Sequence, residues 1–109
     1  MAKMLVNWEH AIERLLERVR LEDRERVQKR IDAMIGLEAP RDATGHYEWH
    51  IDVNSSTGET IARIICRGIA LRTVYGPEMS SASGAKGLPA PKSTSHRYRL
   101  NKAGQFERA

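Results

Sequence analysis

Three side chains near the start of the chain have the chemistry to handle a phosphodiester. His10, Arg14 and Arg18 follow one another at steps of four residues. On a helix this step places them on one ridge. An imidazole can move a proton near neutral pH, and a guanidinium can hold a phosphate through its planar fork. The ridge is either a phosphate-handling surface or an ordinary solvated face, on which Glu13 and Glu17 pair with the arginines.

The spacing of apolar residues predicts the helices that carry this ridge. Residues 7–20 have apolar side chains at steps of three and four, the pattern of an amphipathic helix with Asn7 as its N-cap. A second helix is predicted over residues 23–35, with Asp23 at its N-cap and Gly36 ending it in a left-handed conformation. Residues 38–45 then form a linker, because Pro40 and Gly45 break regular structure.

From residue 46 the period changes to strict alternation, which indicates strands. Residues 46–53 form a half-buried strand, and residues 60–66 and 69–75 form two more, separated by turns at 54–58 and 67–68. The expected fold class is therefore α+β, with two N-terminal helices packed on a three- or four-stranded antiparallel sheet and a flexible basic C-terminal tail. Residues 1–76 form the single domain and residues 77–109 the tail, in which 96–100 could add an edge strand.

The first strand carries four polar side chains on one face. They are His46, Glu48, His50 and Asp52. Same-face neighbours on a strand lie about 6.6 Å apart and the next ones about 13 Å apart, so at most two of them could reach one metal ion. We expect a solvated face or a contact surface there, with no metal site and no cofactor. Cys66, in the most apolar strand, is expected to be a small buried hydrophobe.

The excess positive charge lies at the C-terminal end of the chain. Residues 1–75 hold twelve basic and twelve acidic side chains, whereas residues 76–109 hold six basic and two acidic ones. Such a segment is either a footprint for a polyanion, most often nucleic acid, or a solubilising tail. With no membrane-length apolar run and a single cysteine, the sequence favours a soluble cytoplasmic protein without a disulfide.

Two sequence patterns together resemble a known family. His10, Ala11, Arg14 and Arg18 spell H-A-x-x-R-x-x-x-R on the first helix, and the sheet ends in Arg72-Thr73-Val74-Tyr75. Over residues 5–76 the chain resembles small RelE-like proteins of bacteria and phages, in the barnase, EndoU, colicin and RelE grouping of ribonuclease toxins. The resemblance implies metal-independent RNA cleavage, or an RNA-binding relative without activity.

The resemblance also implies roles for particular residues. The catalytic candidates are a general base or acid and groups that stabilise phosphorane charge or contact a base: His10, Arg14, Arg72 and Tyr75. Tyr75 could equally be an aromatic residue that closes the core at the sheet edge, and Arg18 could be structural or contact a backbone phosphate. The nucleic-acid-binding candidates are Arg18, Arg67, His96, Arg97, Arg99 and Lys102.

A second class of function remains open. The same charged ridge and basic tail would serve a non-enzymatic phage or bacterial regulatory protein that binds nucleic acid or an acidic protein surface. An antitoxin or regulatory protein is a further expected partner. Catalysis requires the imidazole of His10, whereas electrostatic docking requires only the arginines.

Overall fold

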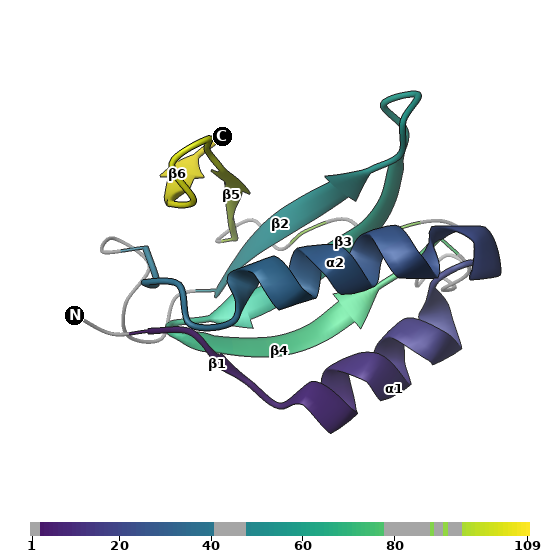
Figure 1. The fold of residues 1–109 in the computed structure, drawn as a ribbon, viewed down its shortest axis with the longest axis horizontal. Helices are drawn as coiled ribbons and strands as arrows, with labels where there is room; N and C mark the ends of the chain where they lie inside the picture. The colour runs from purple at the N-terminus through teal and green to yellow at the C-terminus, as the bar shows by residue number, and fades with distance from the viewer. Residues whose placement is uncertain (1–2, 41–47, 78–87, 89–90, 92–94) are drawn as a thin grey trace.

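The two predicted helices form where the apolar spacing places them. The structure is a computed structural model that describes residues 3–40, 48–77, 88, 91 and 95–109. Helix α1 spans Trp8–Arg18, and the side chain of Asn7 accepts a hydrogen bond from the His10 backbone N–H at 3.2 Å, as expected of an N-cap. A short 3-10 turn, η1 (Leu21–Asp23), leads into α2 (Arg24–Met34) (Figure 1).

The connection between the helices is held by an arginine in place of the expected cap. Asp23 makes no side-chain capping hydrogen bond. Instead, the guanidinium of Arg24 donates to the carbonyls of Val19 (3.1 Å) and Leu16 (2.9 Å), which satisfies acceptors at the end of α1. Gly36 adopts φ +79° after α2, as predicted.

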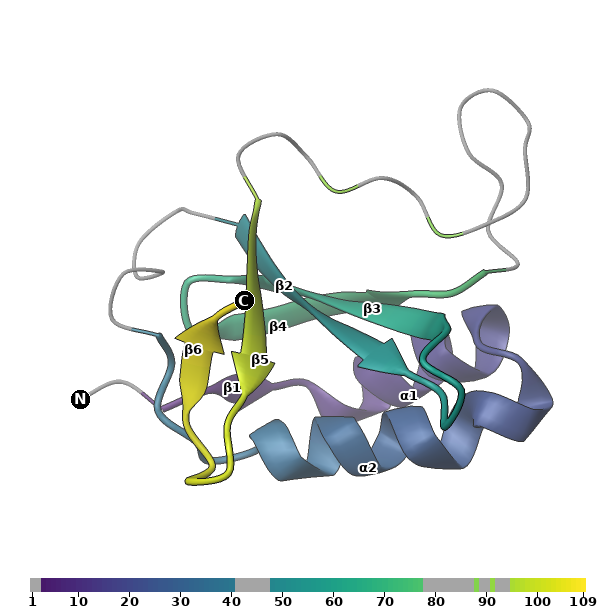
Figure 2. The same ribbon diagram turned by 90° about the horizontal axis from the view of Figure 1, so that it is seen from above.

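Six strands form one mixed sheet. β1 (Leu5–Val6), β2 (Glu48–Asn54), β3 (Thr60–Arg67), β4 (Ala70–Tyr75), β5 (His96–Leu100) and β6 (Phe106–Arg108) lie in the order β1-β4-β3-β2-β5-β6. β2, β3 and β4 pair antiparallel, β1 joins β4 in parallel, β5 joins β2 in parallel, and β6 pairs antiparallel with β5. The sheet curls into a half-barrel with both helices on one side (Figure 2).

The expected fold class is therefore wrong in its sheet. The antiparallel three-stranded centre is present, but the sheet has six strands and is mixed, and two of them lie in the segment predicted to be a flexible tail. The strand expected at 96–100 is present, yet it is not an edge strand, because β6 covers its outer side. His46, Tyr47 and most of the Ser/Gly/Pro-rich stretch 78–94 lie outside the described residues.

The core lies between the helices and one face of the sheet. α1 packs on β4, and α2 packs on β2. Trp49 is fully buried, and its ring meets those of Tyr98 and Phe106 edge-on, with centroids 5.3 and 5.1 Å away. The other large, fully buried side chains come from both helices and the central strands: Leu15, Val27, Ile31, Met34, Ile51, Val53, Ile64, Cys66 and Val74.

Tyr98 should contribute strongly to stability because it packs on Trp49 from β5. Tyr98 is only 2% exposed, so Tyr98→Ala removes a buried aromatic ring. Losses of this kind lower the free energy of unfolding by about 3–5 kcal/mol. Urea unfolding followed by tryptophan fluorescence measures this cost. The control Lys102→Ala, at an exposed turn position, should change the free energy of unfolding by less than about 0.5 kcal/mol. Equal stability of the two variants would show that β5 is not part of the folded core.

Gly76 is required where the end of α1 meets the end of β4. A Cβ atom at this position would lie 1.9 Å from the Arg18 carbonyl oxygen, which is backbone and cannot move aside easily. We expect Gly76→Ala to destabilise the protein by about 1–3 kcal/mol, as overpacked sites do, in the same urea assay. Gly104→Asn is the control, because that turn residue has no neighbour within 4 Å and asparagine tolerates its positive φ. A Gly76→Ala protein as stable as the control would refute this close approach.

Candidate functional site

The ridge predicted on α1 faces the open edge of β4. β1 pairs only with Ala70 and Leu71, so the rest of this edge is not covered by a strand among the described residues. α1 runs beside it, with His10 near Arg72 at one end and Arg18 bonded to Thr73 at the other. We call this line of contact the α1–β4 seam. It brings the two sequence patterns together in space, although they are about sixty residues apart in the chain.

His10 and Arg72 line one open groove at the start of the seam. The groove has a volume of about 540 Å³ and is completed by Leu5, Val6, Asn7, Ala70 and Leu71. Asn7 positions the backbone of His10 through the N-cap. Arg72 is exposed there because the register shifts between Ile65 and Cys66, which leaves Arg72 without a cross-strand partner. Within the described residues neither ring nitrogen of His10 nor the Arg72 guanidinium makes a hydrogen bond, so both remain available to a ligand.

Arg14 lies one helical turn from His10 and is only loosely held. Its Nη1 pairs with Glu17 Oε2 at 2.8 Å, and the two side chains are 33% and 55% exposed. Pairs this exposed contribute about 0.3–0.5 kcal/mol, so an incoming phosphate can displace the carboxylate. The ion pair expected on the ridge is thus present without excluding a ligand.

Arg18 is part of the fold at the far end of the seam. Its Nη1 donates to Thr73 Oγ1 (3.1 Å) and to the Val74 carbonyl (3.2 Å), an acceptor on the strand edge. The same guanidinium lies 5.9 Å from the centroid of the Tyr75 ring. Arg18 therefore has structural contacts, and Tyr75 lies beside it rather than in the His10–Arg72 groove. Three residues of extended chain, about 10 Å, separate Tyr75 from Arg72.

The remaining predicted residues do not line the His10–Arg72 groove. Arg67 is exposed at the end of β3. His96 Nδ1 accepts a hydrogen bond from Arg108 at 2.8 Å, and Arg99 pairs with Glu107 at 2.7 Å. Arg97 is exposed on β5, and Lys102 is exposed in the β5–β6 turn. Because β3 and β2 separate β4 from β5, the structure does not bring the β5 candidates to His10.

The polar face of β2 is more buried than expected. His50 is 3% exposed, and its Nδ1 lies 2.7 Å from Ser95 Oγ. Asp52 Oδ1 accepts a hydrogen bond from Arg63 Nε at 2.7 Å, and each of these side chains is 13% exposed. The expectation of a solvated face is therefore wrong at His50, which is buried and hydrogen-bonded to Ser95. A hairpin register drawn from the 54–58 turn would have placed Asp52 opposite Arg63, but nothing local to β2 indicates Ser95.

The described residues do not meet the requirements of a metal site with three protein ligands, a membrane-spanning helix or a reactive thiol. That part of the chain contains no cluster of three metal-ligating side chains, and none of its helices is long and apolar enough to cross a membrane. Cys66 is buried as predicted, and burial raises the pKa of its thiol.

No family model, curated protein or solved structure matches the chain. The geometry of the α1–β4 seam is therefore what bears on its function.

The burial of His50 should make folding sensitive to pH. Burial lowers the pKa of His50 from its ordinary value of 6.5; the carboxylates of Asp52 and Glu48 oppose this, whereas Arg63 and Arg97 add to it. The unfolded chain therefore takes up this proton at a higher pH than the folded chain. The free energy of unfolding should fall as the pH drops below about 6.5, and the loss should level off below the folded-state pKa.

Urea unfolding at a series of pH values measures this dependence. His50→Gln should remove the His50 part of the slope, since glutamine can still bond to Ser95 but does not titrate. The control His96→Gln leaves His50 intact and should keep that part. An identical slope in wild type and His50→Gln would show that His50 is not held neutral by the fold.

Proposed function

We propose that this chain is a RelE-like, metal-independent endoribonuclease whose reaction takes place in the His10–Arg72 groove. The observation that carries the proposal is that a proton-transfer group and a phosphate-binding group, from two distant parts of the sequence, line one open groove and have no other described side-chain partner. Arg14 adds a second cation one turn along the same helix. A relative that binds RNA at this groove without cleaving it is the weaker form of the proposal.

The groove supports a cleavage step that uses the RNA's own hydroxyl. His10 takes the proton of a ribose 2′-hydroxyl, whose oxygen then attacks the adjacent phosphorus. Arg72 and Arg14 stabilise the negative charge that develops on the phosphorane oxygens. The bond from phosphorus to the 5′ oxygen breaks, leaving a 2′,3′-cyclic phosphate on one fragment. The departing oxygen takes its proton from water, because the described lining residues include no second acid.

The seam also accounts for how the RNA would be held. Arg18 contacts the ring of Tyr75 and donates to the Val74 carbonyl of β4, so these residues are already held in place at the far end of the seam. The exposed part of the Tyr75 ring could stack on a base downstream of the cleaved bond. In this proposal Arg18 positions Tyr75 and β4 and does not touch the reacting phosphate.

Cleavage of a mixed RNA pool in the presence of EDTA tests the proposal. Wild type should produce fragments with cyclic phosphate ends. His10→Ala should slow cleavage by at least about 100-fold, the usual loss of a general base. Arg72→Ala should slow it by a similar factor, because the developing charge is then less stabilised. The exposed α2 residue Gln28, which does not line the groove, gives the control Gln28→Ala, and its rate should equal that of wild type.

Several results would contradict the proposal. Cleavage that EDTA abolishes would indicate a different chemistry, and cleavage that persists in His10→Ala would place the reaction elsewhere. RNA binding without cleavage, abolished in Arg72→Ala, would leave only the weaker form. Neither binding nor cleavage by the wild-type protein would remove both forms.

A further inference from the structure

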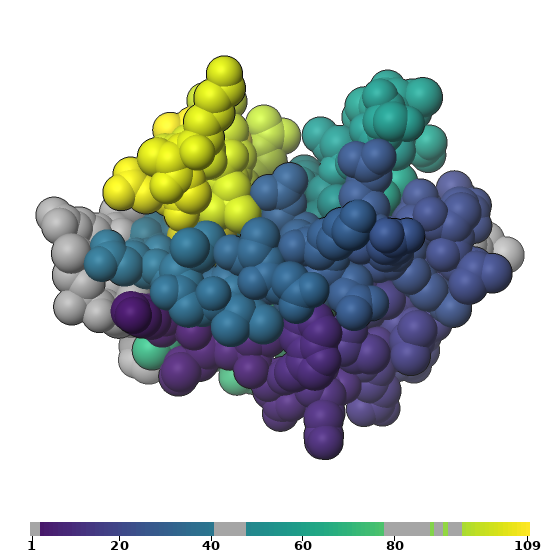
Figure 3. All heavy atoms as spheres, in the orientation of Figure 1, coloured from purple at the N-terminus to yellow at the C-terminus, as the bar shows by residue number. Residues whose placement is uncertain are grey.

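A second basic site lies apart from the His10–Arg72 groove, where β2 and β5 separate. The pairing of these strands covers only residues 49–51 of β2 and residues 96–98 of β5. Beyond this point β2 continues to Asn54 and β5 to Leu100 without pairing to each other. The space-filling view shows the resulting hollow between the β5–β6 hairpin and the β2–β3 hairpin, above α2 (Figure 3). We call it the basic notch.

Two adjoining grooves form the notch, and both are lined by Asn54. One, of about 580 Å³, lies between α2 and the end of β2, and the other, of about 260 Å³, lies between β2 and β5. The cationic lining residues are Arg26, Lys29 and Arg30 from α2 and Arg97 and Arg99 from β5. Two segments about seventy residues apart in the chain thus supply positive charge to one hollow.

Pairing among the lining residues leaves an excess of unpaired arginines. Lys29 pairs with Glu25 at 3.2 Å, and Arg99 pairs with Glu107 at 2.7 Å. The carboxylate of Asp52 is already bound to Arg63. Arg26, Arg30 and Arg97 have no hydrogen-bonded or ion-paired partner within the described residues, and Glu22 is the one lining side-chain carboxylate left unpaired there.

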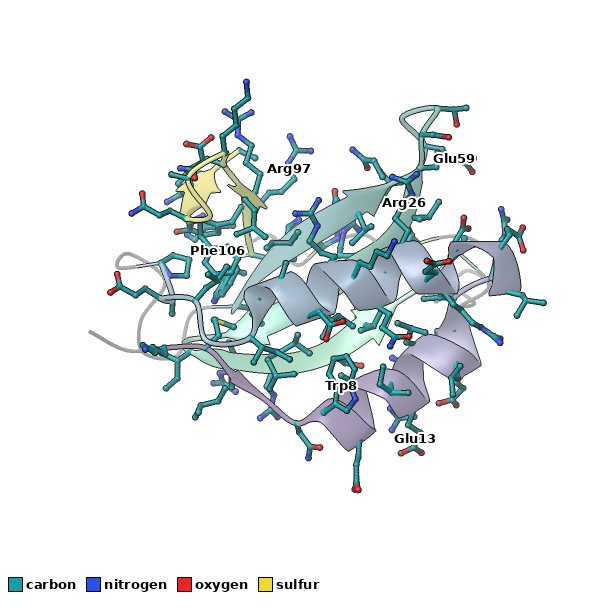
Figure 4. The ribbon with its side chains drawn as sticks, viewed as in Figure 1. Trp8, Glu13, Arg26, Glu59, Arg97 and Phe106 are labelled. Atoms are coloured by element: carbon teal, nitrogen blue, oxygen red, sulfur yellow. The ribbon has the colours of Figure 1, made fainter. Side chains whose placement is uncertain are left out.

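These arginines share their grooves with a donor, the exposed Asn54 at the end of β2. In Figure 4, Arg97 extends from β5 towards the hollow, and Arg26 extends from α2 on the side of the β2–β3 hairpin. Asn54 Oδ1 accepts a hydrogen bond from the hydroxyl of Thr60 at 3.1 Å, which leaves the Asn54 amide hydrogens able to donate. Guanidinium forks and amide donors suit phosphate oxygens.

The lining favours a nucleic-acid strand over a protein partner. Protein interfaces usually centre on a buried apolar or aromatic anchor. The apolar lining residues here are Ala33, Val53, Tyr98 and Ala109. Val53 and Tyr98 are each only 2% exposed, and the two alanines are small. A ligand in the notch would therefore meet charges and amides rather than an apolar pocket, which is the pattern of electrostatic grooves that follow a phosphate backbone.

We infer that the basic notch binds successive phosphates of a single nucleic-acid strand through Arg26, Arg30 and Arg97, with Asn54, which lines both grooves, as a further donor. This site does not depend on the cleavage proposed for the His10–Arg72 groove, because the two sites have no lining residue in common. It would hold a strand whether or not His10 acts on it.

Fluorescence anisotropy with a labelled single-stranded RNA of mixed sequence tests the site, at several salt concentrations and with EDTA present. The test variant is Arg26→Gln/Arg97→Gln, made in the His10→Ala background so that the probe stays intact. We expect the Kd to rise at least tenfold. The slope of log affinity against log salt should fall by about 0.7 for each phosphate that the variant no longer neutralises.

The charge-matched control is Lys3→Gln/Arg20→Gln in the same background, which also removes two positive charges but none from the notch. Its Kd should stay within twofold of the parent. Equal weakening in the two double variants would show a diffuse charge effect and overturn the site, and so would a parent that binds no RNA. Binding of poly-glutamate, but not RNA, through the same arginines would assign the notch to an acidic protein instead. If the His10→Ala protein binds RNA with the expected affinity but the wild-type protein does not cleave it, the nuclease proposal is refuted and the proposed binding site in the notch stands.

Discussion

The packing of Trp49 is the interaction on which the rest of the structure depends. Its indole lies on the central strand β2, donates Nε1–H to the Gly68 carbonyl at 2.8 Å and is fully buried. It therefore anchors the turn between β3 and β4 on one side and meets the rings of Tyr98 and Phe106 on the other. This cluster packs the two C-terminal strands, β5 and β6, against β2. Without it, β5 would keep only three residue pairs with β2.

Local pattern sufficed for the elements whose partners are close in sequence. The apolar spacing predicted the helices to within two residues at most boundaries, and alternation predicted β2, β3 and β4 with their hairpin pairing. β1 is only two residues long, too short for any period to show. The alternation of β5 was visible, but its direction and its partner are decided by contacts with Trp49, about fifty residues earlier. No local signal encodes such a pairing.

The candidate site, too, was predictable only where it depends on local sequence. Placing His10, Arg14 and Arg18 on one ridge needed only the helical period. That Arg72 lines one groove with His10 depends on a register shift opposite Ile65, and that Arg18 is bound to β4 depends on the close approach at Gly76. The basic notch could be predicted from sequence only in part, through the nucleic-acid-binding candidates Arg97 and Arg99. It combines a helix whose arginines resemble an ordinary solvated face with a strand predicted as part of a tail.

The parallel pairing of β5 with β2 has a consequence for the order of folding. β2 is an interior strand of the finished sheet, yet one of its edges can be covered only after residues 96–100 have been synthesised. Until then a nascent chain exposes unpaired backbone groups beside Trp49, which is the kind of edge that recruits strands from other chains. Such a long-range contact also slows folding relative to local pairing. Aggregation during synthesis, more than unfolding of the finished protein, is therefore the hazard that this topology carries.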